Sequence, residues 1–540
     1  MPTPHPERKT LWLALLLSHL SLLAGLLAWI GWQTRPVEMH DLHLADGEKL
    51  KCVSYAPYHH PGQTPFDPAL RISREQIDAD LKALARITDC VRLYSVDQGL
   101  DQVPAIAREH GIEVLLGAWI GYDREKSAAE LGRAIELANA NTDVVRALIV
   151  GNEVLLRRER TEDEMRTLIR EAKSRARVAV TYADVWEFWT RHDSLAQEVD
   201  FVTVHILPFW EDEPVDIERA LEHVAATREH VGEYFAGKDI LIGETGWPSQ
   251  GRQREASRPS QVNQARYVRE FVHQAQAHGW DYNLIEAIDQ PWKRQLEGTV
   301  GGFWGMLDAS TLAPKFPLAG PVAERSGLGR AMAGMAVGAA AGLLLGLGCT
   351  WGGILRRAAL VALGATTGLI AVLHAEHAQV AYRDAFEWSV LGGVALLGIL
   401  LSAAFAAWRG TPIPSAERAW LASRNTPRSF GPAQALGLLR GLLLFATAIA
   451  ALLLFADARY RDFPTLLYLG PAALLGIAGW THAAHGRAER ICAALIALSV
   501  IGRWLPEPAN PQAIAWLATG LALALPPLLA PLTRARQHQE

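Results

Sequence analysis

The stretch DILIGET at residues 239–245 carries a run of apolar residues directly into a glutamate, Glu244. A short apolar run with glycine and proline close behind it is typical of a buried strand. The stretch RALIVGNE at residues 146–153 has the same design and ends in Glu153. Carboxylates are rarely found directly on buried strands unless they have partners or a function. The two glutamates therefore predict one polar site at the ends of two strands.

Six similar runs surround these two, and stretches with helical spacing separate them. Such runs, apolar throughout instead of alternating, favour a parallel sheet covered by helices. Eight repeats over roughly 265 residues fit a (β/α)8 TIM barrel, whose usual length is about 250. An open doubly wound sheet is the alternative, but no glycine-rich phosphate loop follows the first run. The predicted strands are KCVSYAP (51–57), CVRLYS (90–95), IEVLLGAW (112–119), RALIVGNE (146–153), RVAVTYAD (177–184), VDFVTVHI (199–206), DILIGET (239–245) and YNLIEAID (282–289).

Side chains at the carboxyl ends of the strands form the site of such a barrel. Strands four and seven lie on facing sides of the mouth, so Glu153 and Glu244 could flank a sugar linkage. Two carboxylates about 5–5.5 Å apart would act as nucleophile and acid/base with retention. Tryptophans at or just past the strand ends could stack on sugar rings or pack the rim. These are Trp119, Trp186, Trp189, Trp210, Trp247, Trp292 and Trp304.

Five motifs occur in order along this segment: GNEV (151–154), ADVWEFW (183–189), DFVTVHILPFW (200–210), GETGWPS (243–249) and IEAIDQPWK (285–293), the last followed by Glu297 and GFWGML (302–307). Together they resemble glycoside hydrolase family 17, the β-1,3-glucanases and β-1,3-glucanosyltransferases. The resemblance implies that Glu244 is the nucleophile, that Glu153 is the acid/base, and that Asn152 binds the sugar 2-hydroxyl. No metal and no organic cofactor is implied.

Other polar and aromatic residues near the strand ends are expected to contact substrate: Tyr55, Tyr94, Trp119, Asp184, His205, Trp247, Glu286, Trp292, Lys293 and Glu297. Two alternatives stay open. Lys293 and Glu297 could form a plain ion pair, and His205 could be a core histidine. The sequence also departs from many family members at His205, Leu207 and Gln290, which affects the sugar subsites and leaves the glutamate pair intact.

The rest of the chain is apolar. Residues 11–32 carry no charge and follow Arg8 and Lys9, which predicts a transmembrane signal-anchor, with a cleaved signal peptide as the alternative. Seven more apolar runs follow near 331–355, 358–374, 388–408, 441–456, 464–480, 489–505 and 512–532. We therefore expect a cytoplasmic tail (1–10), the anchor (11–32), a linker (33–47), the glycoside hydrolase barrel (48–315), a second linker (316–330), and an all-α polytopic membrane domain of about seven helices with a cytoplasmic C-terminal tail (331–540).

Arginine placement predicts the orientation. With both termini in the cytoplasm, most loop arginines, such as Arg356, Arg409 and Arg487, lie on the cytoplasmic side, and the barrel lies outside. This points to the inner (plasma) membrane with a periplasmic catalytic domain. Cys52 and Cys90 begin neighbouring strands and could pair or remain free thiols. The barrel segment is acidic and has no basic stripe, which disfavours nucleic-acid binding.

These observations predict a retaining glycoside hydrolase or transglycosylase: an endo-1,3-β-glucanase or β-glucanosyltransferase tethered to the membrane. The membrane runs resemble those of membrane-attached bacterial members linked to periplasmic glucan assembly or remodelling. The expected partners are β-glucan chains or oligosaccharides and the lipid bilayer, with a glucan synthase as a further candidate. The alternative is a catalytically silent glucan-binding or export scaffold, which the intact Glu153 and Glu244 argue against.

Overall fold

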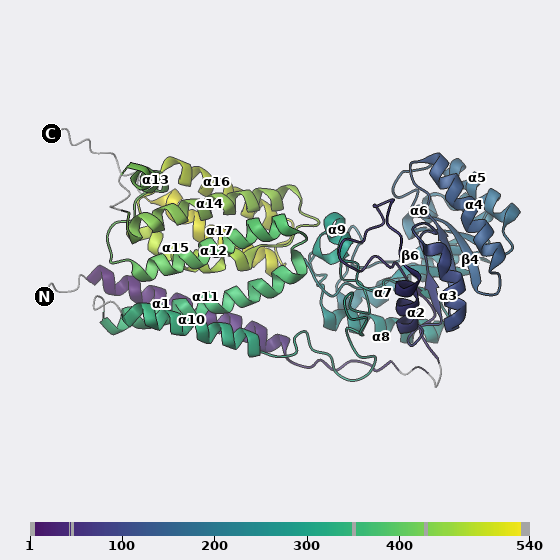
Figure 1. Cartoon of the computed structure of the whole chain (residues 1–540), viewed down its shortest axis with the longest axis horizontal. Helices are drawn as coiled ribbons and strands as arrows, with labels where there is room; N and C mark the ends of the chain where they lie inside the picture. Colours follow the sequence, from purple (N-terminus) through teal and green to yellow (C-terminus); the bar gives the residue numbers. More distant parts are fainter. Residues whose placement is uncertain (1–5, 43, 45–47, 348–352, 426–429, 531–540) are drawn as a thin grey trace. The chain divides into compact units, whose positions relative to one another are not determined.

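A computed structural model of the chain describes residues 6–42, 44, 48–347, 353–425 and 430–530. The chain divides into two compact units, residues 36–322 and residues 1–35 together with 323–540 (Figure 1). Part of the predicted N-terminal tail and the predicted tail after residue 530 lie outside the described residues.

The first unit is a closed barrel of eight parallel strands in sequence order, with β1 pairing with β8. This confirms the predicted (β/α)8 architecture, and each strand falls in the run predicted for it, give or take a residue. The strands are β1 (Val53–Ser54), β2 (Cys90–Arg92), β3 (Glu113–Ala118), β4 (Val145–Asn152), β5 (Ala179–Val185), β6 (Val202–His205), β7 (Ile240–Thr245) and β8 (Asp281–Leu284).

Helices follow the strands and cover the outside of the barrel (Figure 1). Several begin at a side chain that accepts a hydrogen bond from the first turn, as Ser260 does from the Asn263 amide at 2.9 Å and Thr161 does in a capping box. The helices are α2 (Arg74–Leu84), α3 (Val103–His110), α4 (Arg124–Ala140), α5 (Glu162–Arg175), α6 (Trp186–Arg191), α7 (Ile217–Tyr234), α8 (Gln261–His278) and α9 (Arg294–Gly301).

Two apolar cores hold the barrel together. The larger one lies between the strands and the surrounding helices and contains Val91, Val150 and Ile242. The smaller one contains inward-facing residues of the strands: Cys52, Cys90, Leu115, Ala147, Ile149, Ala183 and Leu241. Cys52 and Cys90 form a disulfide in this inner core, so the pairing that the sequence left open is made in the structure.

The two predicted linkers contribute to the barrel unit. Residue Val37 pairs with Val322 in an antiparallel bridge, and the Leu42 amide donates to the Leu318 carbonyl at 2.9 Å. Arg269 of α8 donates to the carbonyls of Pro317 and Gly320. We call the paired segments 37–42 and 317–322 the clasp. The chain therefore enters and leaves the barrel unit through the clasp.

The second unit is helical. Its helices are α1 (Pro6–Gln33), α10 (Gly329–Leu347), α11 (Gly353–Ala381), α12 (Ala385–Ala407), α13 (Ala416–Asn425), α14 (Pro432–Ala456), α15 (Thr465–Thr481), α16 (Arg487–Trp504) and α17 (Pro511–Leu529). Among the described residues, six helices are long and apolar enough to cross a membrane: α1, α10, α11, α12, α14 and α17.

The remaining two apolar runs form shorter or more polar helices. Helix α15 is apolar but short. Helix α16 includes Glu489, the first residue of the predicted run, whose carboxylate is buried and accepts from Arg440 of α14 at 2.8 Å. A buried carboxylate with a paired arginine is tolerated in an apolar bundle because each charge satisfies the other.

Candidate active site

Two β-bulges turn the polar residues of the site into the barrel mouth. Along β7, Leu241 faces inward and Ile242 outward, so strict alternation would point Glu244 away from the mouth. The pairing of β6 with β7 shifts by one residue here, from Val204–Ile242 to His205–Glu244. Such a bulge re-aims the following side chain. The extra residue is Gly243, where a Cβ would lie 2.4 Å from Cγ2 of Thr203, so only glycine fits.

Strand β4 contains a similar bulge. Its pairing with β5 shifts between Ile149 and Asn152, and Gly151 has a φ of +83°. Glu153 follows with a φ of +52°, the left-handed region that non-glycine residues seldom adopt. Strained backbone of this kind clusters at functional sites. Gly151 of GNE and Gly243 of GET therefore both lie at bulges, and each bulge turns a glutamate-bearing segment toward the mouth.

Glu244 is held by donors on one carboxylate oxygen. Its Oε1 accepts from Nη1 of Arg92 at 3.0 Å and from the Tyr94 hydroxyl at 2.8 Å. Burial raises the pKa of Glu244, but the His205 and Arg92 side chains and the Tyr94 hydrogen bond outweigh it, and the pKa lies below its usual value. Within the described residues, no hydrogen bond reaches Oε2. Glu244 therefore presents an ionised carboxylate with one uncommitted oxygen.

The amide of Asn152 is oriented by the same arginine. Nη2 of Arg92 donates to Oδ1 of Asn152, which fixes that atom as the acceptor and leaves the amide NH2 group to donate elsewhere. Arg92 is fully buried and also donates to the Gly243 carbonyl at 2.7 Å. One side chain thus holds the carboxylate of Glu244, the amide of Asn152 and the β7 bulge together.

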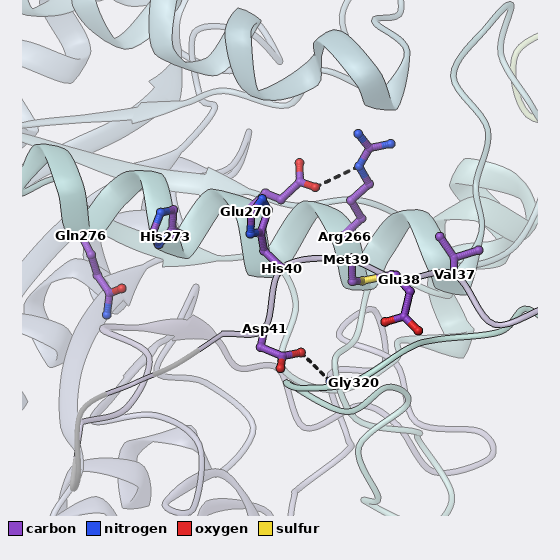
Figure 2. Close-up of a pocket in the computed structure, with 10 residues that line it drawn as sticks. All are labelled: Val37, Glu38, Met39, His40, Asp41, Arg266, Glu270, His273, Gln276 and Gly320. Carbon is purple, nitrogen blue, oxygen red and sulfur yellow. Dashed lines mark hydrogen bonds and ion pairs between the residues drawn. The ribbon is translucent and has the colours of Figure 1, made fainter.

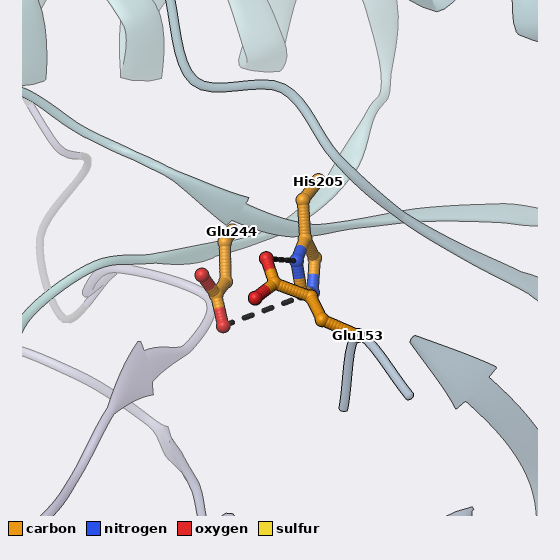
Figure 3. Close-up of side chains that lie close together, drawn as sticks. All are labelled: Glu153, His205 and Glu244. Carbon is orange, nitrogen blue, oxygen red and sulfur yellow. Dashed lines mark hydrogen bonds and ion pairs between the residues drawn. The ribbon is translucent and has the colours of Figure 1, made fainter. Parts of the chain in front are cut away.

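Glu153 and Glu244 lie close together, each beside the imidazole ring of His205 (Figure 3). Nδ1 of His205 lies 3.0 Å from Oε1 of Glu153, and Nε2 lies 3.7 Å from Oε1 of Glu244. A carboxylate oxygen of each glutamate and a nitrogen of the histidine all lie within 4.8 Å of one another. These three residues are also the group among the described residues that could hold a metal ion.

A buried acidic cluster lies beside Glu244. Glu286 has no exposed surface, and its carboxylate accepts from Nζ of Lys293 at 2.9 and 3.0 Å. Burial raises the pKa of Glu286 to about 7, although Lys293 opposes this. Burial also raises the pKa of Glu297, on α9. Lys293 therefore balances more than one carboxyl group at this side of the mouth.

Other residues predicted to contact substrate differ in exposure. Trp119 is 39% exposed and lies under the Arg157 guanidinium at 4.3 Å, and the half-buried Trp292 packs against Phe66. Tyr55 and Trp247 are buried: the Tyr55 hydroxyl donates to Asp80 at 2.8 Å, and the Trp247 indole donates to the Arg258 carbonyl. Both side chains therefore lie in the packed interior of the barrel unit.

Asp184 is also buried, and it accepts from the Tyr182 hydroxyl and the Val185 amide. Burial, followed by the nearby Glu153, raises the pKa of Asp184 to about 6. Asp184 is therefore enclosed by its own hydrogen-bond partners and lies close enough to Glu153 for the two carboxyl groups to interact.

Three supporting residues were not among the predicted site residues: Arg92, Ser54 and Asn283. Asn283 donates to the Ser54 hydroxyl and to the Gly243 carbonyl, each at 2.7 Å, and the Tyr94 hydroxyl lies 2.9 Å from that of Ser54. The available signal was an arginine inside an otherwise apolar strand, CVRLYS. Its partners come from strands far away in the sequence and could not be read from it.

A second hollow lies outside the barrel mouth (Figure 2). It has a volume of about 1090 Å³ and lies between clasp residues 37–41, the outer face of α8 and Gly320. His40 and His273 stack there with ring centroids 6.3 Å apart, and Arg266 pairs with Glu270. Neither Glu153 nor Glu244 lines it, so this hollow is separate from the site described above.

Comparison with known proteins finds that this chain is similar to glycoside hydrolases. Residues 52–305 match the family model of the BtgE/BtgC glycoside hydrolase domain. A glucan 1,3-beta-glucosidase of Saccharomyces cerevisiae is 24% identical over 265 residues, which cover 44% of this chain and 83% of that protein. One of Arthroderma benhamiae is 29% identical over 225 residues, 39% of this chain and 72% of that protein. The crystal structure of a glycoside hydrolase family 17 beta-1,3-glucanosyltransferase from Rhizomucor miehei covers 50% of this chain and 97% of its own, with 24% identity and a TM-score of 0.44.

A closed parallel barrel with two facing carboxylates at its mouth defines the class: the first unit is a glycoside hydrolase domain. Within that class, residues 52–305 match the BtgE/BtgC glycoside hydrolase domain, and the resemblance to glycoside hydrolase family 17 is confirmed. The family match ends at residue 305 and includes none of the helices from α10 onward.

Proposed function

We propose that this protein is a retaining glycoside hydrolase or transglycosylase that acts on β-1,3-glucan, with Glu244 as nucleophile and Glu153 as acid/base. The spacing of the two carboxylates carries the proposal. One carboxylate oxygen of Glu153 lies within 4.8 Å of one carboxylate oxygen of Glu244. This separation suits retaining enzymes, whose two carboxyl groups lie roughly 5–5.5 Å apart, better than inverting enzymes, in which they lie roughly 6.5–9.5 Å apart. The substrate follows from the relatives, which include glucan 1,3-beta-glucosidases.

The proposed reaction has two steps. The free Oε2 of Glu244 attacks the anomeric carbon while the bond to the departing sugar oxygen breaks, and Glu153 gives its proton to that oxygen. Water or a sugar hydroxyl then attacks the same carbon, passes its proton to Glu153 and releases Glu244. The NH2 group of Asn152 donates to the 2-hydroxyl, a contact that strengthens in the transition state. Hydrolysis and transfer differ only in the acceptor.

Mass spectrometry of products tests the reaction. Purified full-length protein in detergent is incubated with linear β-1,3-gluco-oligosaccharides. Products longer than the substrate would show transfer, and only shorter ones would show hydrolysis. An unchanged substrate with correctly folded protein would refute the enzyme and favour a silent glucan-binding scaffold.

Two isosteric variants test the residue roles. Glu244→Gln and Glu153→Gln each remove a reacting carboxylate and should abolish turnover of the oligosaccharide without lowering the melting temperature. Glu109→Gln, in an exposed ion pair with Arg74, is the matched control and should keep full activity. A 2-deoxy-2-fluoro glycoside with a good leaving group should label Glu244, as located by peptide mass spectrometry. A label on another residue would overturn the assignment.

We further propose that the barrel lies outside the cytoplasm, tethered to the membrane and engaged in periplasmic glucan assembly or remodelling of the bacterial type. The six apolar helices, the arginine placement and the Cys52–Cys90 disulfide support this location, because disulfides persist in oxidising compartments. Alkaline phosphatase, which needs an oxidising compartment, should be active when fused after residue 322. An inactive but intact fusion would contradict the orientation.

A further inference from the structure

His205 lies against both glutamates without reaching solvent. It is the last residue of β6, and its side chain has 0% exposure. Figure 3 shows its ring beside the two carboxylates. Thr203 and His205 face inward on the same strand, and the missing Cβ of Gly243 leaves room for the ring, since a Cβ there would lie 3.2 Å from Cδ2 of His205. A side chain buried in this way contacts a sugar only through the groups around it.

The hydrogen bonds define which nitrogen carries a proton. A carboxylate only accepts, so Nδ1 of His205 donates to Oε1 of Glu153 at 3.0 Å. Nε2 faces Nη1 of Arg92 at 3.5 Å, and a guanidinium only donates. This places a proton on Nδ1, toward Glu153. The charged groups around the ring are Arg92 from β2, Glu153 after β4, Asp184 from β5 and Glu244 from β7.

The other oxygen of Glu153 is uncommitted. Across the described residues, no hydrogen bond reaches its Oε2, and the side chain is 23% exposed. A carboxylate on a mobile side chain could turn either oxygen toward the substrate, and loose positioning lowers the rate of proton transfer. The His205 hydrogen bond removes that freedom because it reserves Oε1.

We propose that His205 is a positioning residue for proton transfer: it holds Oε1 of Glu153 so that Oε2 is the oxygen that gives and takes the proton. This inference rests on the proposed function. In the first step, Oε2–H gives its proton to the glycosidic oxygen as the sugar bond breaks. In the second, Oε2 takes a proton from water or the acceptor hydroxyl. His205 keeps its Nδ1 proton throughout.

Leaving-group dependence separates this role from a general structural one. A β-1,3-gluco-oligosaccharide needs protonation of its departing oxygen, whereas a 2,4-dinitrophenyl glycoside of laminaribiose does not. His205→Ala should lower kcat/KM for the oligosaccharide by about 100-fold, the lower end of a general acid's usual contribution. The same variant should lower kcat/KM for the dinitrophenyl substrate less than about 5-fold, because kcat/KM reports only the steps up to formation of the covalent intermediate.

The second step gives an independent signature. With the dinitrophenyl substrate, His205→Ala should show a burst and a lowered kcat, since breakdown of the intermediate needs Oε2 of Glu153 as a base. Azide, a nucleophile that needs no base, should restore kcat. His205→Asn keeps an N–H donor and should recover part of the oligosaccharide activity.

The control is His223→Ala, which removes a histidine hydrogen-bonded to a glutamate, Glu211, in the same way at 3.0 Å but away from the glutamate pair. It should behave as the wild type. Equal losses on both substrates, or no loss on either, would overturn the positioning role of His205. A wild-type protein inert toward both substrates would instead refute the proposed function, so the two failures are distinguishable.

Discussion

Replacing Arg92 by methionine should damage both stability and catalysis. Methionine keeps most of the apolar stem but removes every donor of the guanidinium. In the structure these donors reach Oε1 of Glu244 at 3.0 Å, the Gly243 carbonyl at 2.7 Å and Oδ1 of Asn152. Breaking a buried ion pair from one side costs about 3–5 kcal/mol. Because Arg92 is fully buried, we expect a loss in this range and a clearly lower melting temperature.

The same change should move the pH dependence in a definite direction. Burial raises the pKa of Glu244, and Arg92 is one of the groups that hold it below its usual value. Without Arg92 the pKa of Glu244 rises. In the proposed mechanism Glu244 attacks as a carboxylate, so the acidic limb of kcat/KM should shift to higher pH. The loss of one preorganised donor should also lower kcat by roughly 100- to 1000-fold.

The assay is kcat/KM for the dinitrophenyl substrate between about pH 4 and about pH 8, alongside thermal melts of the full chain in detergent. Arg92→Lys should be intermediate, because one ammonium cannot serve Glu244 and Asn152 as a planar fork does. Arg108→Met, which breaks an exposed pair with Asp143, is the control. An Arg92→Met variant with a wild-type acidic limb and a rate within about 3-fold would refute the reasoning.

Three further outcomes are expected. Asn152→Ala should lower kcat/KM by roughly 10- to 100-fold with a small change in melting temperature, since the proposed contact with the 2-hydroxyl matters most in the transition state. The melting temperature should fall as the pH rises from about 5 to about 8, because burial raises the pKa of Glu286 to about 7 and of Asp184 to about 6, and a protonated buried carboxyl stabilises the fold until it ionises. Cys52→Ser with Cys90→Ser should cost about 4 kcal/mol, from the chain entropy of a loop with sequence separation 38.

Each of these three predictions would be contradicted by a specific result. Unchanged kinetics of the Asn152 variant would remove it from the site. A melting temperature that rises over the same pH range would contradict the sign, which follows from a pKa of Glu286 above the ordinary value of 4.5. Equal unfolding curves for the double serine variant and the oxidised wild type, measured in denaturant, would show that the disulfide does not stabilise the barrel.

Much of the barrel could be predicted from its strands. Parallel strands covered on both faces are apolar throughout, and eight such runs with helical stretches between them leave few alternatives. Glu153 and Glu244 stood out because the motifs GNE and GET place a glutamate directly after an apolar run. Their convergence could not be derived from alternation, because the bulges at Gly151 and Gly243 reverse which face the following side chain occupies.

Other features depend on contacts between distant segments. The sequence pattern does not show whether a tryptophan just past a strand is buried, as Trp247 is, or exposed, as Trp119 is. The role of Arg92 depends on partners about 60 and 152 residues away. In the helical unit, the buried Glu489 of α16 is paired with Arg440 of α14. Such pairings between distant residues cannot be predicted from the local sequence pattern.

The clasp makes the barrel an insertion between neighbouring points of the chain. Val37 and Val322 face each other in one antiparallel bridge, so the residues on either side of the whole catalytic unit meet side by side. A domain whose two ends are adjacent can be removed, and the flanking chain can be rejoined by a short turn. The same domain can be inserted into a surface loop of another protein without distorting either fold. The same adjacency would let evolution exchange one sugar-processing barrel for another while the remaining helices stayed as they are.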